Sequence, residues 1–151
     1  TNLKDVYAPS VEAWLNIEFK TNSFATPMEY ASNLYFGGEL VTDLVIPDGV
    51  VIIGSDTFRD RPEIKKLVLP DSVEILERCA FSGCTGIEEI VFSKNLKLID
   101  EYTLYGCTGL TSLDLPDSLE TVGISALSGC DGLTEIVFPK KLKKSTTSLK
   151  L

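Results

Sequence analysis

Apolar positions recur along the chain every 23 residues from Thr42 onward, with no insertion between the repeats. The blocks begin at Thr42, Lys65, Glu88, Thr111 and Thr134. The third and fifth positions of each block are apolar and alternate with other residues, as in a strand that buries one of its faces. The side chains expected to point inward are Leu44, Ile46, Leu67, Leu69, Ile90, Phe92, Leu113, Leu115, Ile136 and Phe138.

The rest of each block indicates how the chain turns back after the strand. In three blocks Pro-Asp follows, at Pro47, Pro70 and Pro116, and this pair favours a turn because proline presets φ and aspartate can bond to its own backbone. Three further apolar positions come next, and three of the four complete blocks close with Gly-Cys-x-Gly. These later apolar residues are Val50, Val73, Leu96, Leu119, Ile53, Leu76, Ile99, Val122, Phe58, Phe81, Leu104 and Leu127.

A 23-residue unit with one short strand cannot bury its own apolar face. Neighbouring units must therefore stack, and each strand must pair with its counterpart in the next coil. The pattern predicts a repeat solenoid with a parallel β-sheet on one side and short helical or irregular turns on the other. Strands about 4.8 Å apart would make the whole stack only a few nanometres long.

The first 41 residues interrupt this pattern and predict an expanded first repeat with two short helices. Ser10 can cap a helix whose apolar side chains are Val11, Trp14, Leu15 and Phe19. The segment 26–29, Thr-Pro-Met-Glu, combines a cap, a proline at the first helical position and a glutamate placed for a capping box, so it predicts a second helix. Trp14 is either a binding aromatic or a core residue, and a helix packed on the solenoid favours core.

A β-hairpin is expected just before the regular blocks. Gly37 and Gly38 separate the stretches NLYF and ELV, and both glycines accept positive φ. The pair therefore predicts a tight turn between two antiparallel strands. Together with the helices, this hairpin forms a small insert in the first repeat.

Two stretches read IKKLVLPDSVEILERCAFSGC, at 64–84, and LTSLDLPDSLETVGISALSGC, at 110–130. Their shared pattern resembles the leucine-rich repeats of BspA-like bacterial surface proteins, and the resemblance extends closely over residues 40–144. It implies a leucine-rich-repeat solenoid that serves adhesion or recognition by binding a protein ligand, such as a host extracellular protein or another cell-surface protein. It also implies that the protein is secreted or lies at the cell surface.

The resemblance also predicts the domain organisation, in which residues 1–151 form a single leucine-rich-repeat domain. Its parts would be an expanded first repeat over 1–41, four 23-residue repeats over 42–133, and a partial terminal repeat with a basic tail over 134–151. The pattern fails after Leu142, which suits either a polar cap or a cut chain. A start inside a repeat, at Leu3, favours a fragment of a longer array.

The charge limits the classes of partner. The net charge is −8, which disfavours nucleic acid because a phosphate backbone is bound through clustered Lys and Arg. The tail from residue 134 carries five Lys and one Glu, and either forms a contact site or is a solvated chain end. The longest apolar runs are far shorter than the roughly 20 residues of a membrane span, so we expect no membrane insertion by this segment. The start, TNLKDVY, lacks the features of a signal peptide, so an export signal would have been removed or would lie upstream.

The sequence offers few catalytic groups. It contains no histidine, which removes Ser-His and Cys-His nucleophile pairs and His-metal sites. Asp48, Asp71 and Asp117 share one repeat position and would suit a calcium ladder or a turn, but Lys94 and Lys140 interrupt the row and favour the turn. We expect no catalytic, cofactor-binding or metal-binding residues, and an enzyme is the weakest interpretation.

Three cysteines share one repeat position. Cys84, Cys107 and Cys130 would lie side by side in the stack, about one strand spacing apart. Parallel Cβ vectors would keep the Cβ atoms near 5 Å apart, more than the roughly 3.8 Å that a disulfide prefers, so we expect a ladder of buried thiols. Arg61 stands where the first complete block should carry its cysteine. Cys79 is an extra residue, without the paired spacing of a zinc site.

The outward strand positions give the candidate binding surface. The fourth position of each block points away from the buried layer, and Tyr7 occupies the matching place in the first repeat. The candidate ligand-facing residues are Tyr7, Val45, Val68, Val91, Asp114 and Val137. A row of valines on an exposed sheet suits a contact stripe, although valine also simply favours strands. We predict a non-catalytic protein-binding module, and the alternative is a structural spacer that displays another domain.

Overall fold

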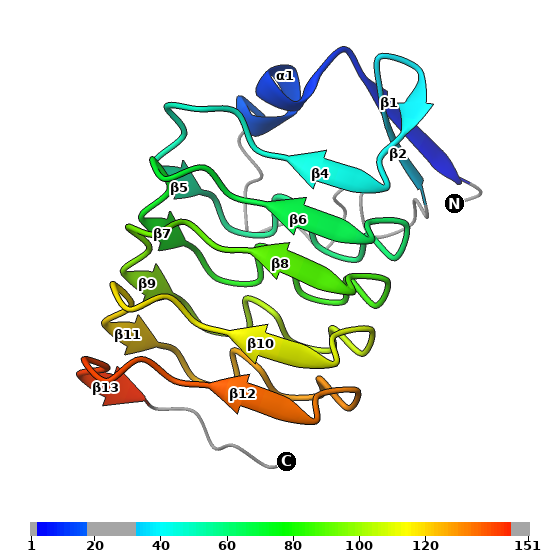
Figure 1. Ribbon diagram of the computed structural model, residues 1–151. Helices are drawn as coiled ribbons and strands as arrows, with labels where there is room; N and C mark the ends of the chain where they lie inside the picture. The colour runs from blue at the N-terminus through cyan, green and yellow to red at the C-terminus, as the bar shows by residue number, and fades with distance from the viewer. Residues whose placement is uncertain (1–2, 18–32, 146–151) are drawn as a thin grey trace.

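The computed structural model describes residues 3–17 and 33–145 and shows a parallel-strand β-solenoid (Figure 1). Two rows of strands run down opposite sides of the stack, and each coil contributes one strand to each row. The long-strand row consists of β4 (Asp43–Val45), β6 (Lys66–Val68), β8 (Glu89–Val91), β10 (Ser112–Asp114) and β12 (Glu135–Val137). The short-strand row consists of β5 (Ile52–Ile53), β7 (Ile75–Leu76), β9 (Leu98–Ile99), β11 (Thr121–Val122) and β13 (Lys144–Ser145).

The long strands pair in parallel at an offset of one block. Leu44 lies opposite Leu67, and Leu67 lies opposite Ile90. Leu44 and Leu67 are fully buried, so equivalent side chains of successive coils stack in the core. The predicted solenoid, with each strand paired to its counterpart in the next coil, is confirmed for β4, β6 and β8 and again for β10 and β12.

The short-strand row adds a second sheet to the turns that were expected away from the long strands. Its strands form a continuous five-stranded parallel sheet in the order β13-β11-β9-β7-β5. The inward residues of its first four strands along the chain, such as Ile53 and Leu76, are fully buried. A strand of two residues is too short to show an alternating pattern, so the sequence reveals its apolar position but not its pairing.

The long-strand row is interrupted between β8 and β10, which form no ladder with each other. Figure 1 shows β10 set apart from β8, whereas the short strands on the opposite side keep an unbroken ladder. Ile90 and Phe92, which were expected to be buried, are therefore only partly buried beside this junction. Ile136 and Phe138 are also only partly buried, because β12 is the last described strand of its row.

A third ladder joins the turns that lie between the two rows. The backbone N–H of Phe58 donates to the carbonyl of Ala80 in the next coil, over 2.9 Å. The same bond recurs one coil later from Phe81 to Thr103, over 3.0 Å. The turn backbone is therefore hydrogen-bonded from coil to coil even though it is irregular.

The first repeat contains β1 (Asp5–Ala8), α1 (Val11–Leu15), β2 (Asn33–Phe36) and β3 (Glu39–Leu40). β1 pairs in parallel with β2, and β2 pairs in antiparallel fashion with β3. Gly37 and Gly38 connect β2 to β3 with φ of 59° and 92°, so the predicted hairpin is confirmed.

The first predicted helix is also confirmed. α1 is the only helix among the described residues, and it follows Ser10, whose Oγ accepts a hydrogen bond from the N–H of Ala13 over 3.3 Å. Phe19, which was expected on the apolar side of this helix, lies outside the described residues. The second predicted helix, at 26–29, also lies outside them. In the described part of the chain no helix is long and apolar enough to cross a membrane.

Candidate functional site

The fourth position of each block, which lies on a long strand, faces outward, as the alternation predicts. The exposed fraction is 56% for Val45, 42% for Val91 and 49% for Val137, while Val68 is half-buried and Asp114 is exposed. Each of these residues lies between two residues that point to the other side of the same sheet, as Val45 lies between buried Leu44 and Ile46. The outward row is therefore a solvent-facing row of mostly apolar side chains.

The structure divides this row into two groups. Val45, Val68 and Val91 are register partners on three paired strands. Asp114 and Val137 are partners on β10 and β12, beyond the interruption that follows β8. Three adjacent valines thus form the largest unbroken apolar group among these outward positions.

Tyr7 lies in a different sheet from the valines. It is 66% exposed and is the register partner of Tyr35 on β2, which was not among the predicted residues. The two rings stack with their centroids 4.6 Å apart and an interplanar angle of 17°. The pKa of the Tyr35 hydroxyl is raised by desolvation and then by the nearby carboxylate of Asp5. The alternation in NLYF, with buried Leu34 as the inward residue, was the available signal for Tyr35.

Charged side chains at the first two positions of the blocks pair between coils. Lys66 Nζ lies 2.9 Å from Glu89 Oε1, and Lys65 Nζ lies 3.7 Å from Glu88 Oε1. All four side chains are substantially exposed, so these pairs contribute little to stability. They do favour the observed register, because opposite charges lie opposite each other on neighbouring coils.

The three repeat cysteines form the predicted ladder of buried thiols. All four cysteines of the chain are free, and the three of the ladder are at most 7% exposed. Each Sγ donates to a backbone carbonyl of the preceding coil: Cys84 to Phe58 over 3.0 Å and Cys130 to Leu104 over 3.1 Å. Burial raises the pKa of Cys84 to about 12 and that of Cys130 to about 11, so these thiols stay protonated and unreactive at neutral pH.

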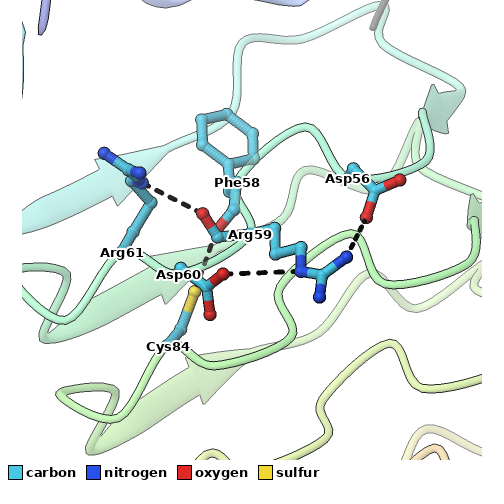
Figure 2. Close-up of polar contacts among 6 residues, drawn as sticks. All are labelled: Asp56, Phe58, Arg59, Asp60, Arg61 and Cys84. Atoms are coloured by element: carbon cyan, nitrogen blue, oxygen red, sulfur yellow. Dashed lines mark hydrogen bonds and ion pairs between the residues drawn. The ribbon is translucent and has the colours of Figure 1, made fainter. Parts of the chain in front are cut away.

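Arg61 replaces the first thiol of the ladder and is itself fully buried. Figure 2 shows Arg61 and Cys84 reaching the backbone of the same turn: Arg61 Nε donates to the carbonyl of Arg59 over 3.0 Å, and Cys84 donates to that of Phe58. Burial lowers the pKa of Arg61, and the nearby Glu63 carboxylate opposes that effect. Glu63 Oε1 accepts the backbone N–H of Leu34 over 2.7 Å, so this carboxylate ties the first regular coil to β2.

Trp14 is a core residue, as the helical spacing favoured, with 2% exposure. Its Nε1–H donates to the carbonyl of Thr57 over 2.9 Å. In later coils the equivalent carbonyls, such as that of Ala80, accept a backbone N–H from the coil before. The indole of α1 therefore takes the place of a preceding coil and terminates the turn ladder.

Asp71 and Cys79 are two further polar side chains that the sequence pattern singles out. The carboxylate of Asp71 accepts the backbone N–H of Lys94 in the next coil over 3.0 Å, so it links neighbouring turns, whereas the sequence suggested a bond within its own turn. Among the described residues no group of three or more His, Cys, Asp or Glu side chains is placed to hold a metal ion. Cys79 is half-buried, and desolvation raises the pKa of its thiol, which makes it a poor nucleophile.

Three solved structures share this fold. A leucine-rich repeat protein of T. pallidum superposes with a TM-score of 0.68 at 28% identity, over 72% of this chain and 52% of its own. A leucine rich cell surface protein of Faecalibacterium prausnitzii gives 0.72 at 22% identity, over 93% and 43%. A leucine-rich repeat protein of Bacteroides ovatus gives 0.58 at 20% identity, over 95% and 43%. The chain thus spans about half the length of these proteins.

No curated protein sequence matches the chain. The family model of the BspA type leucine rich repeat region matches residues 29–149 in six copies. This range includes β2, β3 and all the regular coils, and so covers both strand rows and the thiol ladder. With its 23-residue coils and parallel strand rows, the chain belongs to the BspA-type leucine-rich repeat family.

Proposed function

We propose that this chain is a non-catalytic protein-binding module that works at a bacterial cell surface or in secreted form. Its ligand would be a host extracellular protein or another cell-surface protein, bound through the outward face of the long-strand row. Leucine-rich repeat proteins are typically protein-interaction modules, since stacked repeats create extended binding surfaces. The description of the F. prausnitzii protein as a cell surface protein supports the location.

The observation that carries this proposal is the unbroken group of outward valines on β4, β6 and β8. Val45 and Val91 are 56% and 42% exposed although they lie on paired strands. Adjacent exposed apolar side chains on a regular sheet provide a flat contact surface that loses little side-chain entropy on binding, because valine has few rotamers. The absence of histidine and the raised thiol pKa values favour binding over catalysis.

The test replaces two outward valines with lysine. The double variant Val68→Lys/Val91→Lys places two charges in the contact surface and should lose binding to purified host extracellular-matrix proteins on a surface-binding panel. Its free energy of unfolding should fall by no more than about 2 kcal/mol, because the two side chains contribute mainly strand propensity. Thermal and denaturant melts on the same protein measure that cost.

The matched control is Ile52→Lys/Ile75→Lys, which makes the same kind of change at outward positions of the short-strand row. This control should keep the binding of the native chain. Equal binding by both variants would remove the long-strand face as the ligand surface. Failure of the native chain to bind any protein of the panel would favour the spacer role.

A further inference from the structure

The outward face of the long-strand row is acidic as well as apolar. At the second and fourth positions of the five blocks, which are the outward positions of the long strands, the charged side chains are Asp43, Lys66, Glu89, Asp114 and Glu135. The single cation, Lys66, is already paired with Glu89. No cation of the described residues forms an ion pair with Asp43, Asp114 or Glu135. The charge left over on this face is therefore negative.

Lysines that border the same face do not cancel this charge. Lys65 pairs with Glu88, and Lys94 lies 3.7 Å from the carboxylate of Asp71. Lys140 and Lys141 follow β12 and are exposed, so the free positive charge gathers in the last coil. The negative excess thus extends over β4 to β10, a stretch that includes the three adjacent outward valines of β4, β6 and β8.

The first repeat adds an aromatic platform of the same character. On β1, Asp5 and Tyr7 share one side of the strand, because Val6 and Ala8 pack against the core. Asp5 Oδ1 accepts a hydrogen bond from Asn33 Nδ2 over 2.7 Å, beside the stacked pair of Tyr7 and Tyr35. One face of Tyr7 is open because β1 is an edge strand of its sheet and Tyr7 is 66% exposed. An open tyrosine face next to a carboxylate attracts a cationic side chain.

We infer that the ligand segment of the long-strand face is basic, with Lys or Arg side chains interleaved with apolar ones. This inference rests on the proposed function and specifies its partner. Contact with the valines would remove water from Asp43 and Asp114, and a carboxylate that loses water without a cation is costly. A neutral or acidic segment would impose that cost, whereas a basic segment pairs the carboxylates and covers the valines together. A second copy of this chain, with its net charge of −8, would bring the same carboxylates into contact.

The experiment selects ligands without assuming one. A random peptide library displayed on phage is selected on the immobilised native chain, with the Val68→Lys/Val91→Lys variant as the subtraction step. The retained peptides should be enriched in Lys and Arg spaced by apolar residues. A synthetic peptide of the enriched pattern should bind more weakly as salt is added, because screening weakens the attraction between opposite charges.

Two charge-neutralising variants locate the effect. The variant Asp43→Asn/Asp114→Asn should weaken binding of that peptide by about three- to ten-fold at low salt. The control Glu101→Gln/Asp131→Asn also removes two negative charges, but from turns. An effect of net charge alone would therefore weaken binding equally in both variants.

Retained peptides without basic enrichment, or equal affinities of the two variants, would overturn the inference while leaving the binding face intact. Retention of no peptides at all would count against the proposed binding face itself. A native chain that sediments as a dimer, and as a monomer after Val68→Lys/Val91→Lys, would assign the face to self-association instead.

Discussion

The buried thiols of Cys84, Cys107 and Cys130 make stability depend on alkaline pH. Burial raises their pKa values above the ordinary 9.0, to about 12 for Cys84 and about 11 for Cys130. Between the unfolded and folded values the unfolded chain releases these protons and the folded chain keeps them, so stability falls as pH rises. We expect the free energy of unfolding to be steady below pH 8 and to fall above about pH 9, by about 1.4 kcal/mol per pH unit for each thiol. Urea titrations at a series of pH values measure this slope.

The Cys107→Ala variant is the control for that slope. Tyrosine and lysine also titrate at alkaline pH, but their contribution is the same in both proteins. The variant should be less stable at pH 7, because Cys107 is fully buried and its Sγ donates to the carbonyl of Phe81. Above pH 9 its stability should decline less steeply than that of the native chain. Parallel slopes would mean that the folded chain does not hold this thiol protonated.

Backbone strain recurs at the position occupied by Asp56, Cys79, Tyr102 and Ser125, whose φ values lie between 53° and 58°. This left-handed conformation costs a non-glycine residue about 1 kcal/mol or more. We expect Ser125→Gly to stabilise the fold by up to about 1 kcal/mol. Ser128→Gly, three residues later and without positive φ, should destabilise it by about the same amount. Chemical denaturation of both variants measures the difference, and an equal loss of stability in both would argue against strain at Ser125.

At the scale of elements, α1 acts as the cap of the turn ladder through Trp14. The variant Trp14→Phe keeps an aromatic ring in the core but removes the N–H that bonds to the Thr57 carbonyl. That carbonyl then lacks its donor in a buried place, and we expect a loss of about 1–3 kcal/mol of stability. Denaturant unfolding followed by circular dichroism measures it.

Thr57→Ala serves as the control, because it leaves the backbone carbonyl in place and removes only a hydroxyl that bonds within its own turn. If Trp14→Phe were as stable as the native chain, the indole bond would contribute nothing and the cap would act by packing alone. Trp14→Ala should cost more than Trp14→Phe, about 3–5 kcal/mol, because it also leaves a cavity.

The elements differ in how far the sequence predicts them. The long strands are predictable because Leu67 and Leu69 alternate with outward residues over enough positions to show a period of two. The short strands are not, because Ile75 and Leu76 make only one step. The interruption between β8 and β10 is also not predictable, since the 23-residue spacing continues through it without an insertion.

The sequence predicted which side chains of the candidate site face outward, but it did not predict which of them contact one another. An outward Val45 follows from an inward Leu44, because neighbours on a strand point to opposite faces. The stack of Tyr7 on Tyr35 does not follow, because their pairing joins residues 28 positions apart, which is not the repeat period. The replacement of a backbone donor by Trp14 depends on an irregular first repeat, for which the later coils offer no template.

At the scale of the whole molecule, each coil contacts only its neighbours, so stability should vary along the stack. Leu113→Ala removes a buried side chain from β10, which pairs with β12 but not with β8. We expect hydrogen exchange to accelerate for the amides of Leu115 and Thr134, which bond between these last two coils. The amides of Ile46 and Leu69, in the first coils, should change less.

The reciprocal variant is Leu44→Ala in β4. It should accelerate exchange of the Ile46 and Leu69 amides more than those of the last coils. Exchange read by mass spectrometry or nuclear magnetic resonance distinguishes the two patterns. Uniform acceleration along the stack in both variants would show that the chain opens only as one unit, despite the break in the long-strand row.

Between β8 and β10 the two sides of the stack are unequal, because the short strands stay in their ladder while the long strands stand apart (Figure 1). Where neighbouring coils are further apart on one side of a stack than on the other, the coils tilt away from the side with the wider spacing. We therefore expect the last two coils to tilt relative to the first three, so that the long-strand face changes direction at this junction. A rigid flat ligand can rest on the three valine coils or on the last two coils but not on both, and a flexible segment can follow the curve across them.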